Sequence, residues 1–138
     1  TRKMSKSDEN ANAWVAVLDK PDDIMRKFKR AVTDSAGVIA YDESRPGVAN
    51  LLNIYSAVTG TPVPELVTQL EGQGYGTLKT AVAEAVIETL RPIQERYAQL
   101  IEDKEYLAQC YRAAAERAAR IADRTLAKVM KKVGFVMP

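Results

Sequence analysis

The sequence predicts an all-α fold, a helical bundle of about five helices that follows a loop-rich N-terminal segment. Three observations lead to this prediction. Apolar residues recur at spacings of three and four over most of the chain after residue 20. Proline or glycine stands at most boundaries between these periodic segments, as expected where helices begin and end. No segment shows the sustained alternation of apolar and polar residues that is typical of a half-buried strand.

The N-terminal segment is expected to be a loop that leads into a first helix. Residues 1–13 are rich in Lys, Ser, Asp and Asn, and the apolar run 14–18 is too short for periodicity to distinguish a strand from the approach to a helix. Pro21 suits the first helical position, and the acidic side chains that follow it complement the N-terminal dipole. The apolar face of this helix extends to about residue 32 and consists of Ile24, Phe28 and Val32.

Two shorter helices are expected in the middle of the chain. After an irregular segment over residues 33–46, Pro46 opens a helix that Gly60 ends. A short helix follows Pro64 and ends at the glycines of residues 72–76. Because no strand precedes these glycines and the Walker spacing is absent, they indicate a helix terminator rather than a phosphate-binding loop.

Two long helices complete the expected fold. The first spans about residues 77–102 and should be kinked at Pro92, which removes a hydrogen bond and crowds the preceding turn. The second spans about residues 104–132. Its expected apolar seam consists of Leu107, Tyr111, Ala114, Ala118, Ile121, Thr125, Val129 and Val133.

Composition excludes several classes of protein. The 138 residues are 46% hydrophobic and 28% charged, which is typical of one globular domain, and the net charge of +2 does not by itself imply a nucleic-acid partner. With no histidine and one cysteine, Cys110, the chain cannot form a Ser-His-Asp triad, a Cys-His pair or an internal disulfide. No metal site is predicted. Because we find no membrane-spanning run or secretory signal, we expect a cytoplasmic protein with no membrane partner.

The most specific string in the sequence is the pentapeptide KMSKS at residues 3–7. It offers two ammonium groups and two hydroxyl groups, which together suit an anionic ligand. Composition alone favours a solvated loop, but the full match to one specified pentapeptide, followed by Asp8 and Asn10, reverses that preference. The members of this lysine loop are Lys3, Met4, Ser5, Lys6 and Ser7.

Several later stretches match one family in the same order. They are KRAVTDS at 29–35, RPGVANLLNIY at 45–55, GYG at 74–76 and ETLRPIQERY at 88–97. Together with the lysine loop they resemble the bacterial tryptophanyl-tRNA synthetases, which are class I aminoacyl-tRNA synthetases. The resemblance spans nearly the whole chain. Tyrosyl-tRNA synthetases are the nearest competing family, but they should not share the later stretches.

The resemblance implies a role for the lysine loop. In this family the loop closes over ATP, and its lysines stabilise the negative charge that develops as pyrophosphate departs. Lys3 and Lys6 are therefore the expected catalytic residues, with Lys6 nearest the triphosphate, and residues 3–7 form the expected ATP-binding loop. ATP would be a substrate, accompanied by Mg²⁺, for the activation of tryptophan and its transfer to tRNA-Trp.

The resemblance also predicts how the chain is organised. Residues 1–20 would be the lysine loop and the end of a catalytic domain, and residues 21–138 a helical tRNA (anticodon)-binding region. The Rossmann-type catalytic half would be absent, because the chain holds none of the features of the family's earlier half, and Thr1 is not a natural start. The fragment alone is therefore expected to bind no cofactor and to be inactive. Expected partners are tRNA-Trp, the missing N-terminal half and a second copy in a homodimer.

A strip of basic residues on the last predicted helix is the candidate RNA-binding surface. Its members recur at spacings of three and four beside the apolar seam, so they would line one edge of the helix. Charge alone favours a merely solvated face, because Glu116 and Asp123 interrupt the strip, whereas the family resemblance favours tRNA contact. A second basic group, at residues 26–30, lies on the first helix. The strip consists of Arg117, Arg120, Arg124, Lys128 and Lys131.

Two alternatives stay open at this point. A non-catalytic helical RNA-binding module would explain the basic strip, but it would have no use for the lysine loop. A purely structural helical adaptor would make the basic strip incidental, and charge reversal at Arg120 and Arg124 would then leave its binding unchanged.

Overall fold

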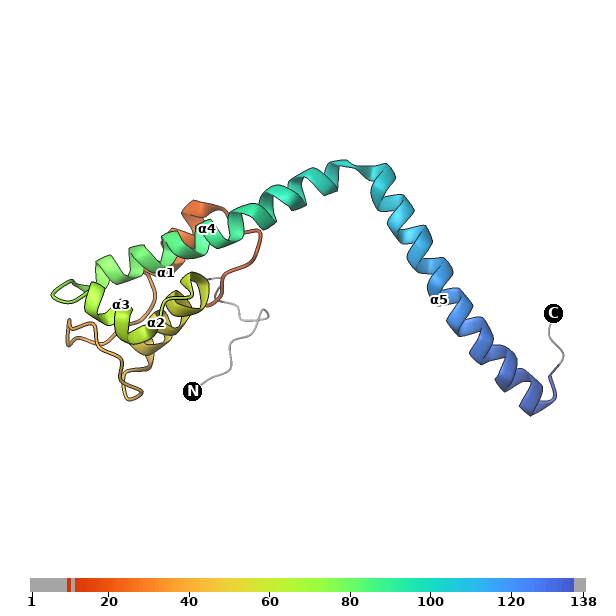
Figure 1. The fold of residues 1–138 in the computed structure, drawn as a ribbon, viewed down its shortest axis with the longest axis horizontal. Helices are drawn as coiled ribbons and strands as arrows, with labels where there is room; N and C mark the ends of the chain where they lie inside the picture. Colours follow the sequence, from red (N-terminus) through yellow and green to blue (C-terminus); the bar gives the residue numbers. More distant parts are fainter. Residues whose placement is uncertain (1–9, 11, 136–138) are drawn as a thin grey trace. The chain divides into compact units, whose positions relative to one another are not determined.

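The computed structural model describes residue 10 and residues 12–135. This part of the chain contains five α-helices and no strand (Figure 1), which confirms the predicted all-α fold. The helices are α1 (Pro21–Lys29), α2 (Pro46–Thr59), α3 (Val63–Gln69), α4 (Tyr75–Glu102) and α5 (Lys104–Val133).

Helix α1 begins at Pro21 as predicted, but it ends at Lys29 rather than near residue 32. Val32 was expected on its apolar face and is instead 86% exposed. The reason is that the backbone at Val32 passes close to Gly47 in α2. A Cβ atom added at Gly47 would lie only 2.3 Å from the carbonyl oxygen of Val32. The chain leaves the helix early so that its backbone can pass against the first turn of α2.

Helix α2 confirms the predicted boundaries most closely. Pro46 stands in its first turn, and Gly60 caps its end in the left-handed region with φ of 73°. That conformation is accessible to glycine at little steric cost, which explains why the helix ends there. The segment 14–18 is neither strand nor helix, and Val17 and Leu18 are half exposed.

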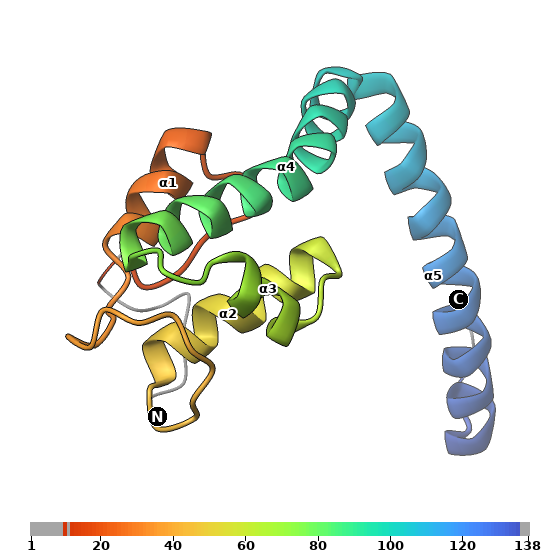
Figure 2. The same ribbon diagram turned by 60° about the vertical axis from the view of Figure 1, so that its left-hand side comes forward.

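The chain divides into two compact units, Thr1–Glu95 and Arg96–Pro138. In the first unit, α1, α2, α3 and the first part of α4 share one hydrophobic core (Figure 2), which Ile39 of the 33–45 loop also joins. Full burial of each large aliphatic side chain stabilises such a core by about 1.5–3 kcal/mol. The largest fully buried side chains are Ile24, Val48, Leu52, Leu66, Leu78 and Val82.

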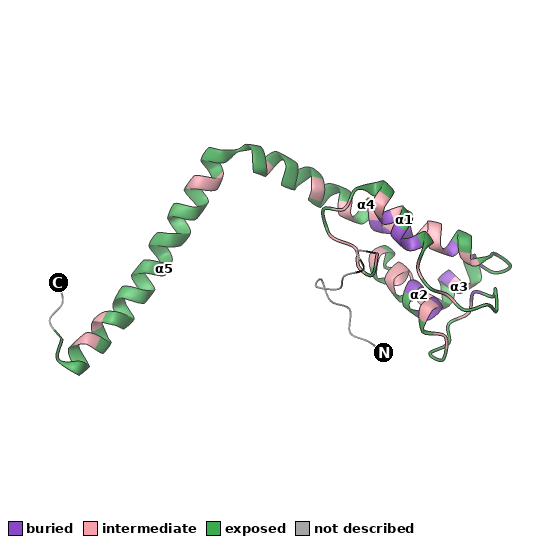
Figure 3. Cartoon of the chain, turned by 180° about the vertical axis from the view of Figure 1, so that it is seen from behind, coloured by how far each residue is buried: buried purple, intermediate pink, exposed green. Residues whose placement is uncertain are grey.

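Helix α5 contains no buried residue, as its green and pink colouring in Figure 3 shows. The predicted seam is present as a helical stripe, but its members Tyr111, Ile121 and Val133 are exposed. Within the described residues this stripe contributes no side chain to a buried core. Helix α4 continues through Pro92, and a kink at that position stays a prediction.

Candidate functional site

The lysine loop, Lys3 to Ser7, lies outside the described residues, so the roles assigned to its members stay predictions. The structure does describe the segment that follows it. We call residues 12–19 the loop base, because the chain passes through them between the lysine loop and α1. This segment has no regular secondary structure, so its conformation depends on the side chains that hold it.

Asp19 is the centre of the contacts that hold the loop base. Its Oδ2 atom accepts a hydrogen bond of 2.8 Å from the backbone N–H of Ala16 and one of 2.6 Å from Nζ of Lys27. Partial burial acts to raise the pKa of Asp19, but the hydrogen bonds from Lys27 and Ala16 outweigh it and hold the pKa below its usual value. The carboxylate therefore stays ionised and ties α1 to the loop base.

Lys27 is 7% exposed, which is unusual for a lysine. Its Nζ lies 4.8 Å from the centroid of the Trp14 ring, so the ammonium group is placed between an aromatic face and the Asp19 carboxylate. These two partners compensate the loss of hydration that burial imposes on a charge. Lys27 belongs to the second basic group noted in the sequence, but it holds the loop base and is not available as a surface charge.

Two further side chains fasten the loop base. The Nε2 group of Gln94, on α4, donates hydrogen bonds of 2.7 Å to the carbonyl oxygen of Val17 and 3.0 Å to that of Asp19. Arg26 donates to Asn12 Oδ1 at 2.6 Å and also pairs with Asp23. The loop base is thus held by side chains of both α1 and α4.

A second polar network joins three of the stretches that carry the family resemblance. Nε of Arg45 lies 2.9 Å from Oδ2 of Asp34, and the hydroxyl of Tyr75 donates to Oδ1 of Asp34 at 2.6 Å. Arg45 also donates to the Tyr75 hydroxyl and to the carbonyl oxygen of Val38. The hydrogen bonds from Arg45, and then from Tyr75, hold the pKa of Asp34 far below its usual value. This network fixes the 33–45 loop against the start of α4.

The basic strip has the geometry that the sequence predicted. All five of its members lie on α5 and are exposed, and none forms an ion pair within residues 12–135. The ammonium and guanidinium groups of Arg117, Arg120, Arg124, Lys128 and Lys131 are therefore free to contact an anionic partner.

The sequence profile of the family described as "tRNA synthetases class I (W and Y)" matches residues 1–91. This match covers the lysine loop, the loop base and the Asp34 network, which is about two-thirds of the chain. The chain belongs to this family. The matched residues include the stretches 29–35, 45–55 and 74–76, and they end within the stretch 88–97.

Two curated relatives of this class I synthetase chain are both named tryptophan–tRNA ligase. A tryptophan–tRNA ligase of Clostridium acetobutylicum is 45% identical over 137 residues, covering 99% of this chain and 41% of its own length. One from Enterococcus faecalis is 49% identical over 136 residues, covering 98% and 40%. The chain therefore spans about 40% of the length of these relatives.

A solved structure shows a similar fold. The crystal structure of tryptophanyl-tRNA synthetase from Mycoplasma pneumoniae matches with a TM-score of 0.73 and 31% identity, over 98% of this chain and 41% of that one. The match confirms the helical arrangement as that of part of a class I synthetase.

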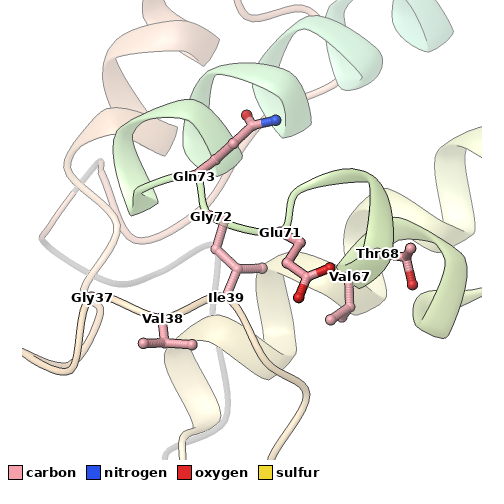
Figure 4. A pocket seen from close by; sticks show the side chains of 8 residues that line it. All are labelled: Gly37, Val38, Ile39, Val67, Thr68, Glu71, Gly72 and Gln73. Atoms are coloured by element: carbon pink, nitrogen blue, oxygen red, sulfur yellow. The ribbon is translucent and has the colours of Figure 1, made fainter.

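A hollow of about 490 Å³ lies between the 33–45 loop and the end of α3 (Figure 4). Gly72 and Gln73 of the glycine-rich stretch line it, and so does the carboxylate of Glu71. With an acidic group and no basic one in its lining, the hollow does not suit a phosphate. Gly72 has φ of 74° and lies in the turn after α3, as predicted. Gly76 was also expected to break a helix, but it lies in the first turn of α4.

Two further features are absent from the described residues. No group of three or more His, Cys, Asp or Glu side chains in this part of the chain could hold a metal ion. No helix among the same residues is both long enough and apolar enough to cross a membrane.

Proposed function

We propose that this chain supplies the lysine loop and a tRNA-contacting helical region to a tryptophan–tRNA ligase. The observation that carries the proposal is the KMSKS pentapeptide at the start of a chain whose residues 1–91 match the class I family. The relatives that match at 45–49% identity over nearly the whole chain are named tryptophan–tRNA ligases. The substrates of the whole protein are therefore tryptophan, ATP and tRNA-Trp.

The lysine loop acts by electrostatics. As a carboxylate oxygen of tryptophan bonds to the α-phosphorus of ATP and pyrophosphate leaves, negative charge grows on the oxygen that bridged the α- and β-phosphates. Lys6, assisted by Lys3, stabilises that charge more strongly in the transition state than in the bound substrate, which lowers the barrier. Met4, Ser5 and Ser7 complete the ATP-binding loop. Mg²⁺ arrives as the counterion of ATP, and the described residues of this chain provide no cluster of ligands for it.

The proposal is tested by tryptophan-dependent exchange of pyrophosphate into ATP, measured on the full-length ligase. Lys6→Ala removes one charge from the developing pyrophosphate and should lower the exchange rate about 100-fold, which is typical for loss of one transition-state donor. Lys20→Ala is the matched control, because Lys20 is exposed and directly follows the loop base in the sequence. Exchange that does not require tryptophan, or that survives Lys6→Ala unchanged, would contradict the proposal.

The basic strip supplies the tRNA contacts in this proposal. Lysines and arginines that neutralise phosphates give an affinity that falls steeply with salt, and each contact contributes about 0.7–0.9 to the slope of log affinity against log salt. Reversing Arg120 and Arg124 to Glu should weaken binding of tRNA-Trp at least tenfold and lower that slope by about two. Reversal of Lys104 and Arg112, which are exposed on the same helix outside the strip, is the control.

The non-catalytic RNA-binding module is the second candidate, favoured by the exposure of the whole basic strip. A transcript of tRNA-Trp with a changed anticodon shows whether residues 21–138 recognise the anticodon or bind RNA only through its charge. Weaker binding of the changed transcript supports the anticodon-binding role of residues 21–138, and equal binding would contradict it.

The proposal also covers the organisation of the whole protein. Residues 1–20 form the lysine loop and the end of the catalytic domain, and the ligase is a cytoplasmic homodimer.

A further inference from the structure

Two adjacent hollows lie where the 33–45 loop meets α2 and α3. The first is the hollow of Figure 4, between this loop and the end of α3. The second has the same volume, about 490 Å³, and lies between Tyr41 of the loop, Asn53 of α2 and the start of α3. Val67 lines both hollows, which makes them neighbours. Pockets of about 300–1,000 Å³ are the usual size for a small organic ligand.

The wall that the 33–45 loop supplies to both hollows is held in place. Ile39 is 6% exposed and joins the core. Arg45 donates a hydrogen bond of 2.7 Å to the carbonyl oxygen of Val38. The loop is therefore fastened on both sides of Tyr41. A wall that is already formed reduces the ordering that binding of a ligand would require.

The side chains that the hollows present are of the kinds that bind unpaired nucleobases. Tyr41 is 45% exposed, so its ring is accessible to a ligand. The carboxylate of Glu71 lines the first hollow and extends toward Val67 (Figure 4), and the amide of Asn53 lines the second. None of these three side chains forms a hydrogen bond or an ion pair with another described residue. Unpaired bases of RNA stack on aromatic rings and form hydrogen bonds along their edges.

The charge of the lining restricts the ligand further. The residues that line the two hollows, all in the described part of the chain, include no lysine or arginine. A phosphate would therefore meet the charge of Glu71 with no compensating cation. A carboxylate accepts hydrogen bonds and cannot donate them, so it can accept the amino group of cytosine but repels the carbonyl oxygen that uracil carries at the same position. The first hollow thus suits a base with an exocyclic amino group.

We propose that the two hollows bind two adjacent unpaired bases of tRNA-Trp, one stacked on Tyr41 and the other a cytosine held by Glu71. The anticodon that pairs with the tryptophan codon UGG is CCA, which places two cytosines in succession in a single-stranded loop. Asn53 binds the edge of the stacked base. The inference rests on the proposed anticodon-binding role of residues 21–138. It goes beyond the basic strip, because contacts to phosphates carry no base specificity.

The test is the affinity of the full-length ligase for three transcripts of tRNA-Trp, with anticodons CCA, UCA and CUA, at one salt concentration. The original protein should bind the CCA transcript at least about fivefold more tightly than one of the two uracil transcripts, as expected for one well-placed base contact. Glu71→Gln should lower this ratio to less than about twofold, because an amide can also donate a hydrogen bond to the uracil carbonyl. The ratio for the other uracil transcript should not change.

Glu65→Gln is the matched control, since it removes the same charge from an exposed side chain of α3 that lines neither hollow. Both ratios should keep their original values in this variant. Tyr41→Ala should weaken binding of all three transcripts about tenfold through the loss of stacking, and Tyr41→Phe, which keeps the ring, should bind as the original protein does. If Tyr41→Ala lowers the melting temperature, the ratio measured with Glu71→Gln decides alone.

The outcomes separate this inference from the proposed function. If the original protein discriminates against a uracil transcript and Glu71→Gln leaves that ratio unchanged, the cytosine is recognised elsewhere and the inference fails. An equal fall of the ratio in Glu65→Gln would reveal a general effect of charge and would also overturn it, as would full affinity of a folded Tyr41→Ala variant. If the original protein binds all three transcripts equally, or binds none, the anticodon-binding role fails and this inference fails with it.

Discussion

The first part of α4 and the helix α5 have the same kind of sequence but different environments. In both, apolar residues recur at spacings of three and four. Leu78 and Val82 of α4 are fully buried, whereas Ile121 of α5 is 66% exposed and the whole helix contains no buried residue. Periodicity therefore identifies which face of a helix is apolar, but burial depends on residues elsewhere that cover this face.

The basic residues of α1 and α5 show the same difference. Lys27 and Arg120 each lie in a group of basic residues on a predicted helix. Lys27 is buried against Asp19 and Trp14, and Arg120 is exposed with no ion pair in the described part of the chain. The charge of Lys27 stabilises the fold, whereas the charge of Arg120 is available to a partner. The sequence alone does not distinguish these two roles.

The largest difference between the two regions should appear when apolar side chains are truncated. Leu78→Ala removes a fully buried side chain and should lower the free energy of unfolding by about 2–5 kcal/mol. Ile121→Ala, on the exposed seam, should change it by less than about 0.5 kcal/mol. Urea unfolding of the 138-residue chain, followed by the fluorescence of Trp14, measures both. Equal losses would show that the α5 seam is packed in solution.

Glycine substitutions extend the comparison to the backbone. Gly47→Ala would place a Cβ atom 2.3 Å from the carbonyl oxygen of Val32, so α2 or the 31–33 segment must move. We expect a loss of about 1–3 kcal/mol in the free energy of unfolding. Gly74→Ala meets no atom within 4 Å and is the matched control, with no loss expected. A neutral Gly47→Ala would refute the close approach that explains the early end of α1.

The Asp34 network should make the stability of the first unit depend on pH. Because Arg45 and Tyr75 lower the pKa of Asp34 in the folded chain, the unfolded chain takes up a proton first as the pH falls. The network's contribution is complete above the ordinary carboxyl pKa of about 4 and is lost progressively below it. Asp34→Asn should remove this part of the pH dependence. Urea midpoints between pH 6 and pH 3 test this, and identical slopes for both proteins would contradict it.

The smallest effect is expected for an exposed ion pair. Glu88 and Arg91 pair one turn apart on α4, with both side chains more than half exposed. Glu88→Gln should change the free energy of unfolding by less than about 0.5 kcal/mol, because water and salt screen such a pair. A loss above 1 kcal/mol in the same urea experiment would show that this part of α4 is more closely packed than its exposure indicates.

Local signals were sufficient to predict the helices and several of their ends. Pro21, Pro46 and Gly60 act through their own backbone, so their effects can be read without knowing the fold. The early end of α1 could not be predicted, because it depends on the approach of Val32 to Gly47. The exposure of the α5 seam could not be predicted either, since a stripe carries no information about the residues that would cover it.

The candidate site was predictable as motifs but not as contacts. The lysine loop and the stretches containing Asp34, Arg45 and Tyr75 were identified as strings, yet Tyr75 and Asp34 lie 41 residues apart and their hydrogen bond follows only from the fold. Gln94 lies 77 residues from Val17, whose carbonyl group it binds. Lys27 carried no signal that distinguished it from its basic neighbours, because burial of a lysine depends on partners that the fold supplies.

Amide hydrogen exchange of the 138-residue chain, followed by mass spectrometry, tests most directly whether the core belongs to the first unit alone. We predict strong protection for peptides that cover residues 78–86, whose side chains join the core. Peptides that cover residues 111–133 of α5 should exchange much faster, because no buried contact stabilises that helix. Protection of α5 equal to that of residues 78–86 would contradict the account and show that its apolar seam is covered within this chain.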